Sequence, residues 1–214
     1  MRTHKKARLA LGLILLLILS VTVFFVVRGT AVIKRTCRAD INAKINDIIN
    51  VSNDKVINLD VFYADYFTII YDENNDIAAI KANTGLINQI TLIWNTEIQN
   101  GLNKLRNTKI VMPFGALTGS SLLAKYGMDI SIDAQVISNC AITYASHFTQ
   151  AGINQTLHRF VLYTEIVAEI IVPSGVENVI VSQEIVLAET IINGKVPQSY
   201  LIGDGTLDYL DLIP

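Results

Sequence analysis

The densest group of polar side chains in this chain of 214 residues lies at 154–159, where Asn, Gln, Thr, His and Arg occur within six positions. His147 precedes this group across an expected turn. Two histidines on paired strands could bind a metal ion, with Glu165 or Glu169 as a third ligand. His158 and Glu165 are, however, an odd number of residues apart, which would place them on opposite faces of a regular strand. Two interpretations stay open: a metal or acid–base site, or a hydrogen-bonded corner whose amide side chains satisfy the backbone of a bulge.

A second candidate is the glycine pattern Gly115-x-x-x-Gly119-Ser120, which superficially resembles a phosphate-binding loop. It lacks the lysine and the spacing that such a loop needs, so we interpret it as a turn between two parts of the chain. The sequence contains no Gly-x-Ser-x-Gly motif and no two-cysteine metal knuckle, and no base stands beside Ser120 or Ser121. We therefore expect no cofactor and no enzyme, although catalytic groups can also converge in space from distant positions.

The two cysteines, Cys37 and Cys140, are far apart in the sequence and lack the spacing of metal ligands. A disulfide between them would be compatible with a compartment outside the cytoplasm, but nothing in the pattern requires it. We expect two free thiols.

An uninterrupted apolar run without a charged residue occupies residues 9–27. A helix that rises about 1.5 Å per residue crosses a hydrocarbon core of about 30 Å in about 20 residues, so this run predicts a transmembrane helix. A cleaved signal peptide would have an apolar region of about 7–15 residues followed by small residues. Here the run is longer, and Phe, Val, Val and Arg occupy 25–28. We expect an uncleaved anchor in contact with the lipid bilayer.

Basic residues flank the run on both sides, and the cluster before it is denser. The positive-inside rule then favours a single-pass protein of the cell membrane, with its N-terminus in the cytoplasm and its C-terminal domain outside. The formal net charge is −2, and because the positive charges gather beside the run, the distal part is acidic. An acidic domain does not favour nucleic acid as a partner.

The first half after the run predicts the order α-β-β-α-β. Residues 36–50 form an amphipathic helix, since Ile recurs at 41, 45, 48 and 49. Strands at 66–71 and 77–82 form a hairpin, and a long amphipathic helix begins after Asn83 or Thr84. A short strand follows at 109–112. Two helices on one face of a small sheet would bury both apolar stripes.

The second half predicts an antiparallel meander of four strands within 129–192, because apolar residues alternate with polar ones. The runs 130–136 and 140–148 precede a turn at 150–155. The run 156–172 is so long that a bulge or a strong twist is expected in it. The chain turns at 173–178 and returns over 179–192. The fold class is therefore α+β.

We expect four segments: a cytoplasmic tail and transmembrane anchor at 1–28, an α-β-β-α-β subdomain at 29–112, a β-rich subdomain at 113–200, and a C-terminal tail at 201–214.

Three stretches at 111–120, 151–158 and 188–200 carry distinctive motifs: VMPFGALTGS, AGINQTLH and AETIINGKVPQSY. In this order after an anchor, they resemble the sporulation protein YunB family of endospore-forming Firmicutes. This chain departs from the family at Gly127-Met128, where members tend to have Gly-Pro, and at Asn193, where the stretch is usually more apolar. The residues that carry the resemblance are Pro113, Gly115, Gly119, Ser120, Gly152, Asn154, Gln155, Thr156, His158, Glu189, Gly194, Pro197 and Tyr200.

The resemblance implies a membrane protein needed for spore formation, at the forespore or mother-cell membrane, and it brings no catalytic residues with it. Two hypotheses follow. In the first, the extracytoplasmic domain is an interaction or assembly module for other envelope or sporulation proteins or for further copies of itself. In the second, it is an envelope hydrolase, or a domain that binds lipid or another ligand, and uses the region of His147 and His158.

Overall fold

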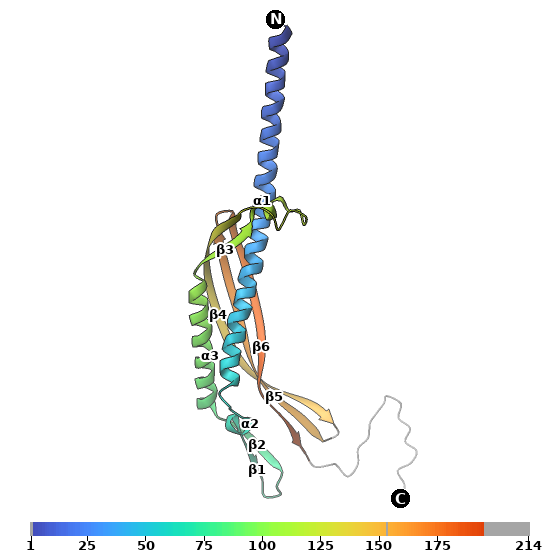
Figure 1. The fold of residues 1–214 in the computed structure, drawn as a ribbon. Helices are drawn as coiled ribbons and strands as arrows, with labels where there is room; N and C mark the ends of the chain where they lie inside the picture. The colour runs from blue at the N-terminus through green and yellow to red at the C-terminus, as the bar shows by residue number, and fades with distance from the viewer. Residues whose placement is uncertain (1, 153, 195–214) are drawn as a thin grey trace, which may run out of the picture.

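The computed structural model describes residues 2–152 and 154–194, and its longest element is one helix, α1 (Arg2–Ile57). In Figure 1 the first part of α1 stands clear of the folded body and the second part runs into it. The separate helix predicted from residue 36 is instead the continuation of the apolar helix. Nothing in the sequence of α1 interrupts it, because the segment contains no proline.

The two parts of α1 differ in burial, as their sequences require. From Leu11 to Val27 the described apolar side chains are exposed, and the helix is long and apolar enough to cross a membrane. After this run a single stripe turns inward, and its members Cys37, Ile41, Ile45 and Ile49 are fully buried. The predicted isoleucine stripe is therefore confirmed, with Ile48 only partly buried at its border.

The middle of the chain forms a short helix, a hairpin and a long helix. These are α2 (Tyr63–Tyr66), β1 (Phe67–Tyr71), β2 (Ile77–Ala82) and α3 (Thr84–Leu105). The Asn83 side chain accepts a hydrogen bond from Leu86 N at 3.2 Å, which confirms the predicted N-cap. Trp94 lies within the apolar stripe of α3 and is fully buried.

The large sheet has the order β3-β4-β5-β6 and is antiparallel throughout. Its strands are β3 (Asn107–Pro113), β4 (Asp129–Gly152), β5 (Gln155–Val172) and β6 (Gly175–Asn193). The short helix η1 (Phe114–Thr118) follows β3. The small three-stranded sheet expected within 29–112 is wrong, because β3 pairs with β4 and leaves β1 and β2 as a separate hairpin.

Two further strand predictions need correction. The runs at 130–136 and 140–148 are not two strands but parts of β4, and the turn expected at 173–178 is confined to Pro173 and Ser174. The fourth strand of the sheet is therefore β3. A bulge or a strong twist is expected in the run 156–172; the register between β5 and β6 does shift after Phe160, but the extra residue of this bulge, Leu187, lies on β6.

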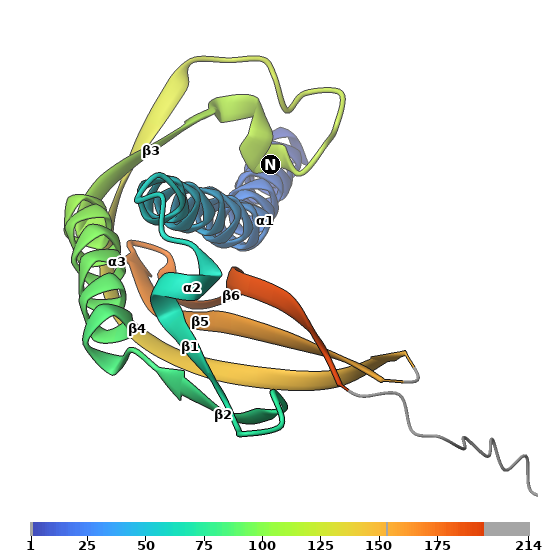
Figure 2. The same cartoon turned by 90° about the horizontal axis from the view of Figure 1, so that it is seen from below.

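The core lies between the helices and one face of the sheet, as the view from below shows (Figure 2). The even-numbered residues of β5 from Phe160 to Val172 face α1 and α3 and are all buried. Their odd-numbered neighbours Arg159, Glu165 and Glu169 are exposed on the other face. This arrangement confirms the α+β class, with an N-terminal apolar helix and antiparallel sheets.

Candidate functional site

The two histidines of the predicted metal site lie on opposite faces of the large sheet. His147 is paired with Arg159 and His158 with Phe148, so neighbouring strands carry them with opposite orientation. His147 is exposed, and its Nε2 lies 2.9 Å from the Tyr163 hydroxyl on the outer face. The site that would combine both histidines is therefore wrong. Among the described residues, no group of three or more His, Cys, Asp or Glu side chains could hold a metal ion.

His158 is fully buried in an aromatic corner that joins β4 and β5 to α2 and β1. Its ring stacks on Phe148 with centroids 4.2 Å apart and meets the Phe67 ring edge-on at 4.7 Å. Its Nδ1 lies 2.7 Å from the Tyr63 hydroxyl, while Nε2 has no hydrogen-bond partner among the described residues. Burial lowers the pKa of His158, because the charged imidazolium would lose its solvation there. A neutral, packed ring of this kind holds elements together.

The rest of the polar group at 154–159 meets the third family motif across the strand pair β5–β6. Gly194 N donates to the Asn154 carbonyl at 2.7 Å, and Arg159 Nε contacts the Glu189 carboxylate at 2.5 Å on the outer face. The fold thus brings together the predicted site residues Gly152, Asn154, Gln155, Thr156, His158, Glu189 and Gly194. Pro197 and Tyr200 lie outside the described residues. This end of the sheet is a hydrogen-bonded corner, but backbone groups and Arg159 make these contacts, and the amide side chain that bonds the bulge backbone is that of Gln150, whose Nε2 donates to the Gly152 carbonyl at 3.3 Å.

The first family motif lies at the opposite end of the sheet, beside α1 (Figure 1). Gly115 has no room for a side chain, since a Cβ there would stand 2.0 Å from the carbonyl oxygen of Leu123. Gly119 ends η1 with φ 71°, a conformation that favours glycine. Thr118 Oγ1 donates to the Gly115 carbonyl and accepts from Ser120 N. These residues build a rigid loop and show no phosphate-binding chemistry.

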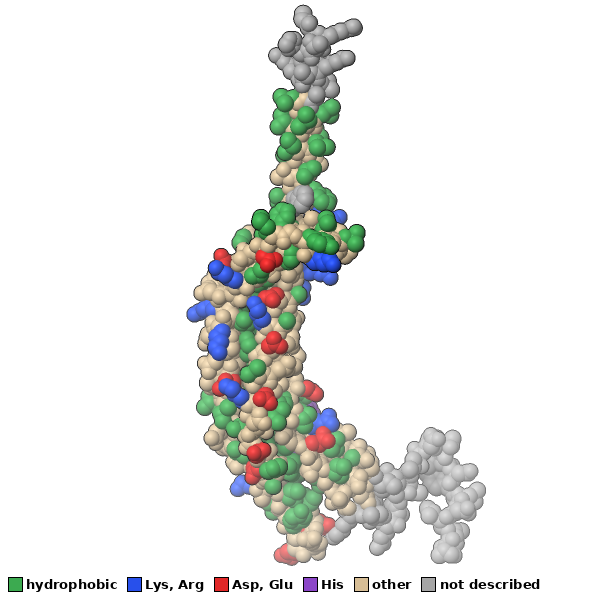
Figure 3. Space-filling model, viewed as in Figure 1, with side chains coloured by type: hydrophobic (Ala, Val, Ile, Leu, Met, Phe, Trp, Pro, Cys, Tyr) green, Lys and Arg blue, Asp and Glu red, His purple; other side chains and the backbone are tan. Residues whose placement is uncertain are grey.

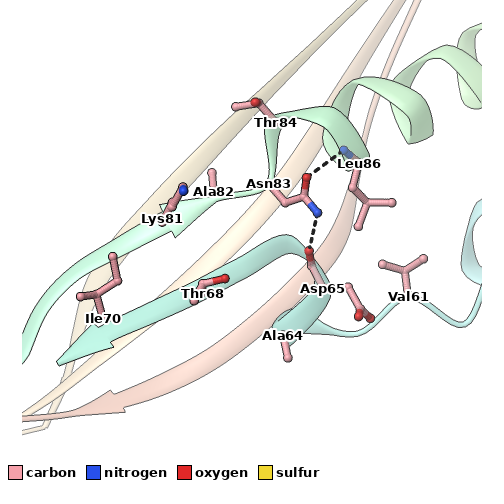
Figure 4. A pocket seen from close by; sticks show the side chains of 10 residues that line it. All are labelled: Val61, Ala64, Asp65, Thr68, Ile70, Lys81, Ala82, Asn83, Thr84 and Leu86. Carbon is pink, nitrogen blue, oxygen red and sulfur yellow. Dashed lines mark hydrogen bonds between the residues drawn. The ribbon is translucent and has the colours of Figure 1, made fainter.

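A pocket between α2, the hairpin and the start of α3 has several polar side chains (Figure 4). The Asn83 amide donates to the Asp65 carbonyl at 3.3 Å while its oxygen caps α3. The Asp65 carboxylate accepts from Phe62 N at 2.8 Å. Both side chains are therefore engaged in holding the chain ends of α2 and α3, and the pocket contains no nucleophile with an adjacent base.

Both cysteines are free, as expected. Cys37 is buried in the core, and burial raises the pKa of Cys140 to about 11. Neither thiol has the environment of a reactive cysteine.

Sequence reasoning missed two features of these sites. Tyr63 and Phe67, which close the aromatic corner around His158, come from the distant hairpin region and share no sequence pattern with it. The short helix η1 packs against α1, where its Leu117 lies 3.9 Å from the position of a Cβ on Gly29. No pattern in the sequence indicates this contact.

The three motifs lie in a part of the chain that is similar to known proteins. The family model "Sporulation protein YunB" matches residues 109–199. The "Sporulation protein YunB" of Bacillus subtilis (strain 168) is 25% identical over 146 residues, which cover 64% of this chain and 58% of that protein. The match therefore spans less than two thirds of that relative's length. No solved structure matches this chain. Residues 109–199 carry the sequence pattern of the YunB family of sporulation proteins, which confirms the resemblance seen in the three motifs.

Proposed function

We propose that this chain is a single-pass membrane protein of sporulating cells whose extracytoplasmic domain binds another protein of the forespore envelope. The family match supports the role in sporulation, and the exposed apolar half of α1 supports the anchor. Among residues 2–152 and 154–194, neither end of the sheet brings together a nucleophile and an adjacent base, so we favour binding over catalysis as the activity of this domain.

The observation that carries the proposal is the outer edge of β6. This strand of 19 residues pairs with β5 on one side, and no other described strand lies against its second side. Exposed edges are usually protected by proline, by charged side chains, by a bulge, or by a helix or loop that covers them. From 175 to 193 the sequence contains neither proline nor lysine; its charged residues are Glu177, Glu184 and Glu189, the one bulge in its pairing with β5 lies at Leu187, and α1 contacts the strand. An edge of this length presents backbone groups to which a further strand can be added.

The neighbouring outer face of the sheet supports the same conclusion. Val167 and Ile180 are cross-strand partners and are 42% and 64% exposed, and Ile137 on β4 is 54% exposed. The side chains of a strand added to β6 would continue this apolar surface and shield its neighbouring part from water.

The direction of β6 favours a different protein over a second copy as the partner. β6 runs along the second half of α1 (Figure 1), so the anchor fixes its direction relative to the membrane. Two copies in one membrane would present their β6 edges in the same direction. The tighter antiparallel pairing of two β6 edges would invert one copy and its anchor. An extended segment of another envelope protein has no such restriction.

Site-specific photo-cross-linking in sporulating cells tests this proposal. A photoreactive residue replaces Ile180 on β6, and the matched control replaces Leu92 on α3, because both side chains are 64% exposed. We expect Ile180 to give an adduct with a protein of different mass and Leu92 to give none. The absence of an adduct at Ile180, equal adducts at both positions, or an adduct of twice the chain's mass would contradict the proposal.

A further inference from the structure

A loop of 15 residues, 114–128, displays large apolar side chains beside the point where the apolar run of α1 ends. We call residues 114–128 the stem loop. Four of its large side chains are half or more exposed, Leu122 (80%), Met128 (82%), Tyr126 (59%) and Phe114 (50%), and Leu123 is 49% exposed. Such a concentration of exposed apolar surface in one loop indicates a binding surface.

The stem loop is held firmly, so the exposure is a property of its fold. Phe114 N donates to the Met128 carbonyl at 2.8 Å and Gly115 N to the Tyr126 carbonyl at 2.9 Å. Leu123 N donates to the Ser120 carbonyl at 3.2 Å. Because these backbone groups are satisfied within the loop, placing it in a less polar environment carries a smaller desolvation cost.

The position of the stem loop along α1 shows at which depth of the bilayer the loop would lie. A Cβ on Gly29 would lie 3.9 Å from Leu117, and a Cβ on Gly119 would lie 3.9 Å from Val32. These contacts are one to four residues beyond Arg28, the first charged residue after the run, which corresponds to about 2–6 Å along a helix. The headgroup region of a bilayer is about 5–8 Å deep on each side, so the loop lies at that depth.

The charges of the stem loop fit a lipid surface. Residues 114–128 contain no Asp or Glu. Lys125 Nζ lies 5.4 Å from the centre of the Tyr126 ring, and Arg28 lies over Phe24 at 5.7 Å. Figure 3 shows hydrophobic side chains together with Lys and Arg where the exposed first part of α1 meets the folded body. Leu and Met that enter the acyl boundary, with Tyr and Lys at headgroup level, are the composition of interfacial membrane segments.

We infer that the stem loop is a second membrane contact, with Leu122, Tyr126 and Met128 inserted into the interface of the same bilayer that α1 spans. This inference rests on the proposed anchoring by α1. The two contacts together would fix the tilt and the rotation of the domain on the membrane, which a single helix leaves free.

Fluorescence quenching in vesicles tests the inference on the full-length protein. Leu122→Cys carries an environment-sensitive fluorophore, and Ile180→Cys, on the outer face of the sheet, is the matched control. Both positions are exposed, so neither label disturbs the core, and the native thiols are buried or half-buried. The vesicles contain phosphatidylethanolamine and phosphatidylglycerol with a lipid spin-labelled near the headgroup.

We expect a roughly twofold loss of emission from the label at 122, with protection from aqueous iodide, because an interfacial segment lies within reach of shallow spin labels. The label at 180 should show no lipid quenching and full quenching by iodide. Flotation of the same vesicles reports the anchor separately. Protein that floats with an unquenched label at 122 would overturn the stem-loop contact alone, whereas protein that fails to float would overturn the anchoring on which it depends.

Discussion

His158 shows how a residue that looks catalytic in a sequence can be structural in the fold. Its type and its polar neighbours suggested metal or acid–base chemistry, but strand alternation points it into the core, where it stacks on Phe148. The odd spacing to Glu165 already argued against a shared site, and the structure confirms that separation. The partners on the hairpin could not be predicted, because they depend on how distant elements pack.

The buried His158 predicts a pH-dependent stability. Its folded-state pKa lies below the ordinary value of 6.5, so the unfolded chain takes up a proton as the pH falls through 6.5 while the folded chain does not. The free energy of unfolding should therefore decrease from pH 7 downwards, until the lowered pKa is reached. Thermal unfolding of the full chain in detergent at several pH values measures this.

His158→Phe should flatten that pH dependence, at a cost of about 1 kcal/mol for the lost hydrogen bond with Tyr63. His147→Gln is the control, since His147 is exposed on the other face, and it should keep the slope of the original chain. An unchanged slope in His158→Phe would show that another group is responsible.

Gly115 is a second residue whose role is steric. In Gly115→Ala the new Cβ would stand 2.0 Å from the Leu123 carbonyl oxygen and 2.5 Å from that of Tyr126, and backbone atoms cannot move aside cheaply. We expect a loss of about 2–3 kcal/mol of stability in the stem loop. Hydrogen exchange of the loop amides measures it directly.

Gly85→Ala provides the comparison, because its Cβ would be in ordinary contact, 3.6 Å from Asn83 Oδ1, in the first turn of α3. It should be neutral or stabilise by about 0.5 kcal/mol through helix propensity. Equal effects of the two substitutions would mean that the close approach at Gly115 is not a constraint.

The individual elements follow largely from local patterns, whereas their pairing does not. The helix stripes and the hairpin could be predicted because each depends on periodicity or turn residues within a short window. The alternating runs 130–136 and 140–148 predict two strands, but the residues between them, including Ser138 and Asn139, pair with β5 in one continuous ladder. The sheet that β3 joins could not be predicted, because the alternation of a short strand fits either sheet and its pairing with β4 is a contact between distant parts of the chain.

The contact between α1 and α3 depends on Gly101. A Cβ at this position would lie 2.5 Å from Cγ2 of Ile48, so the glycine lets the two helices approach. Gly101→Ala should destabilise by about 1 kcal/mol, since overpacking of about 1–3 kcal/mol exceeds the gain of up to about 1 kcal/mol in helix propensity. Chemical denaturation measures the change.

The double variant Ile48→Ala/Gly101→Ala should be more stable than the sum of the two single effects predicts, because removing the isoleucine branches makes room for the new methyl group. Strict additivity would show that the helices do not meet at this point.

For the whole molecule, the topology predicted from the basic flanks can be tested with thiol chemistry. Cys37 is buried and the pKa of Cys140 is raised to about 11, so the original chain should react slowly at neutral pH and serves as the blank. Glu73→Cys, in the exposed hairpin turn, should react with a membrane-impermeant maleimide on intact cells that express the chain without sporulating, because an extracytoplasmic domain then faces the medium.

Thr3→Cys, before the apolar run, should react only after the cells are permeabilised. The reverse pattern of labelling would place the domain in the cytoplasm and exclude an envelope partner.

The continuity of α1 has a mechanical consequence. A helix of 56 residues is about 84 Å long, and no proline hinge separates its apolar half from the half that forms the core. The folded domain of each copy is therefore joined rigidly to its transmembrane helix, and its angle follows the local normal of the bilayer surface. Where the membrane is convex on the side of the domains, the distal ends of neighbouring domains would lie further apart. Where it is concave, these ends would lie closer together. The curvature of the membrane would therefore set the distance between neighbouring domains.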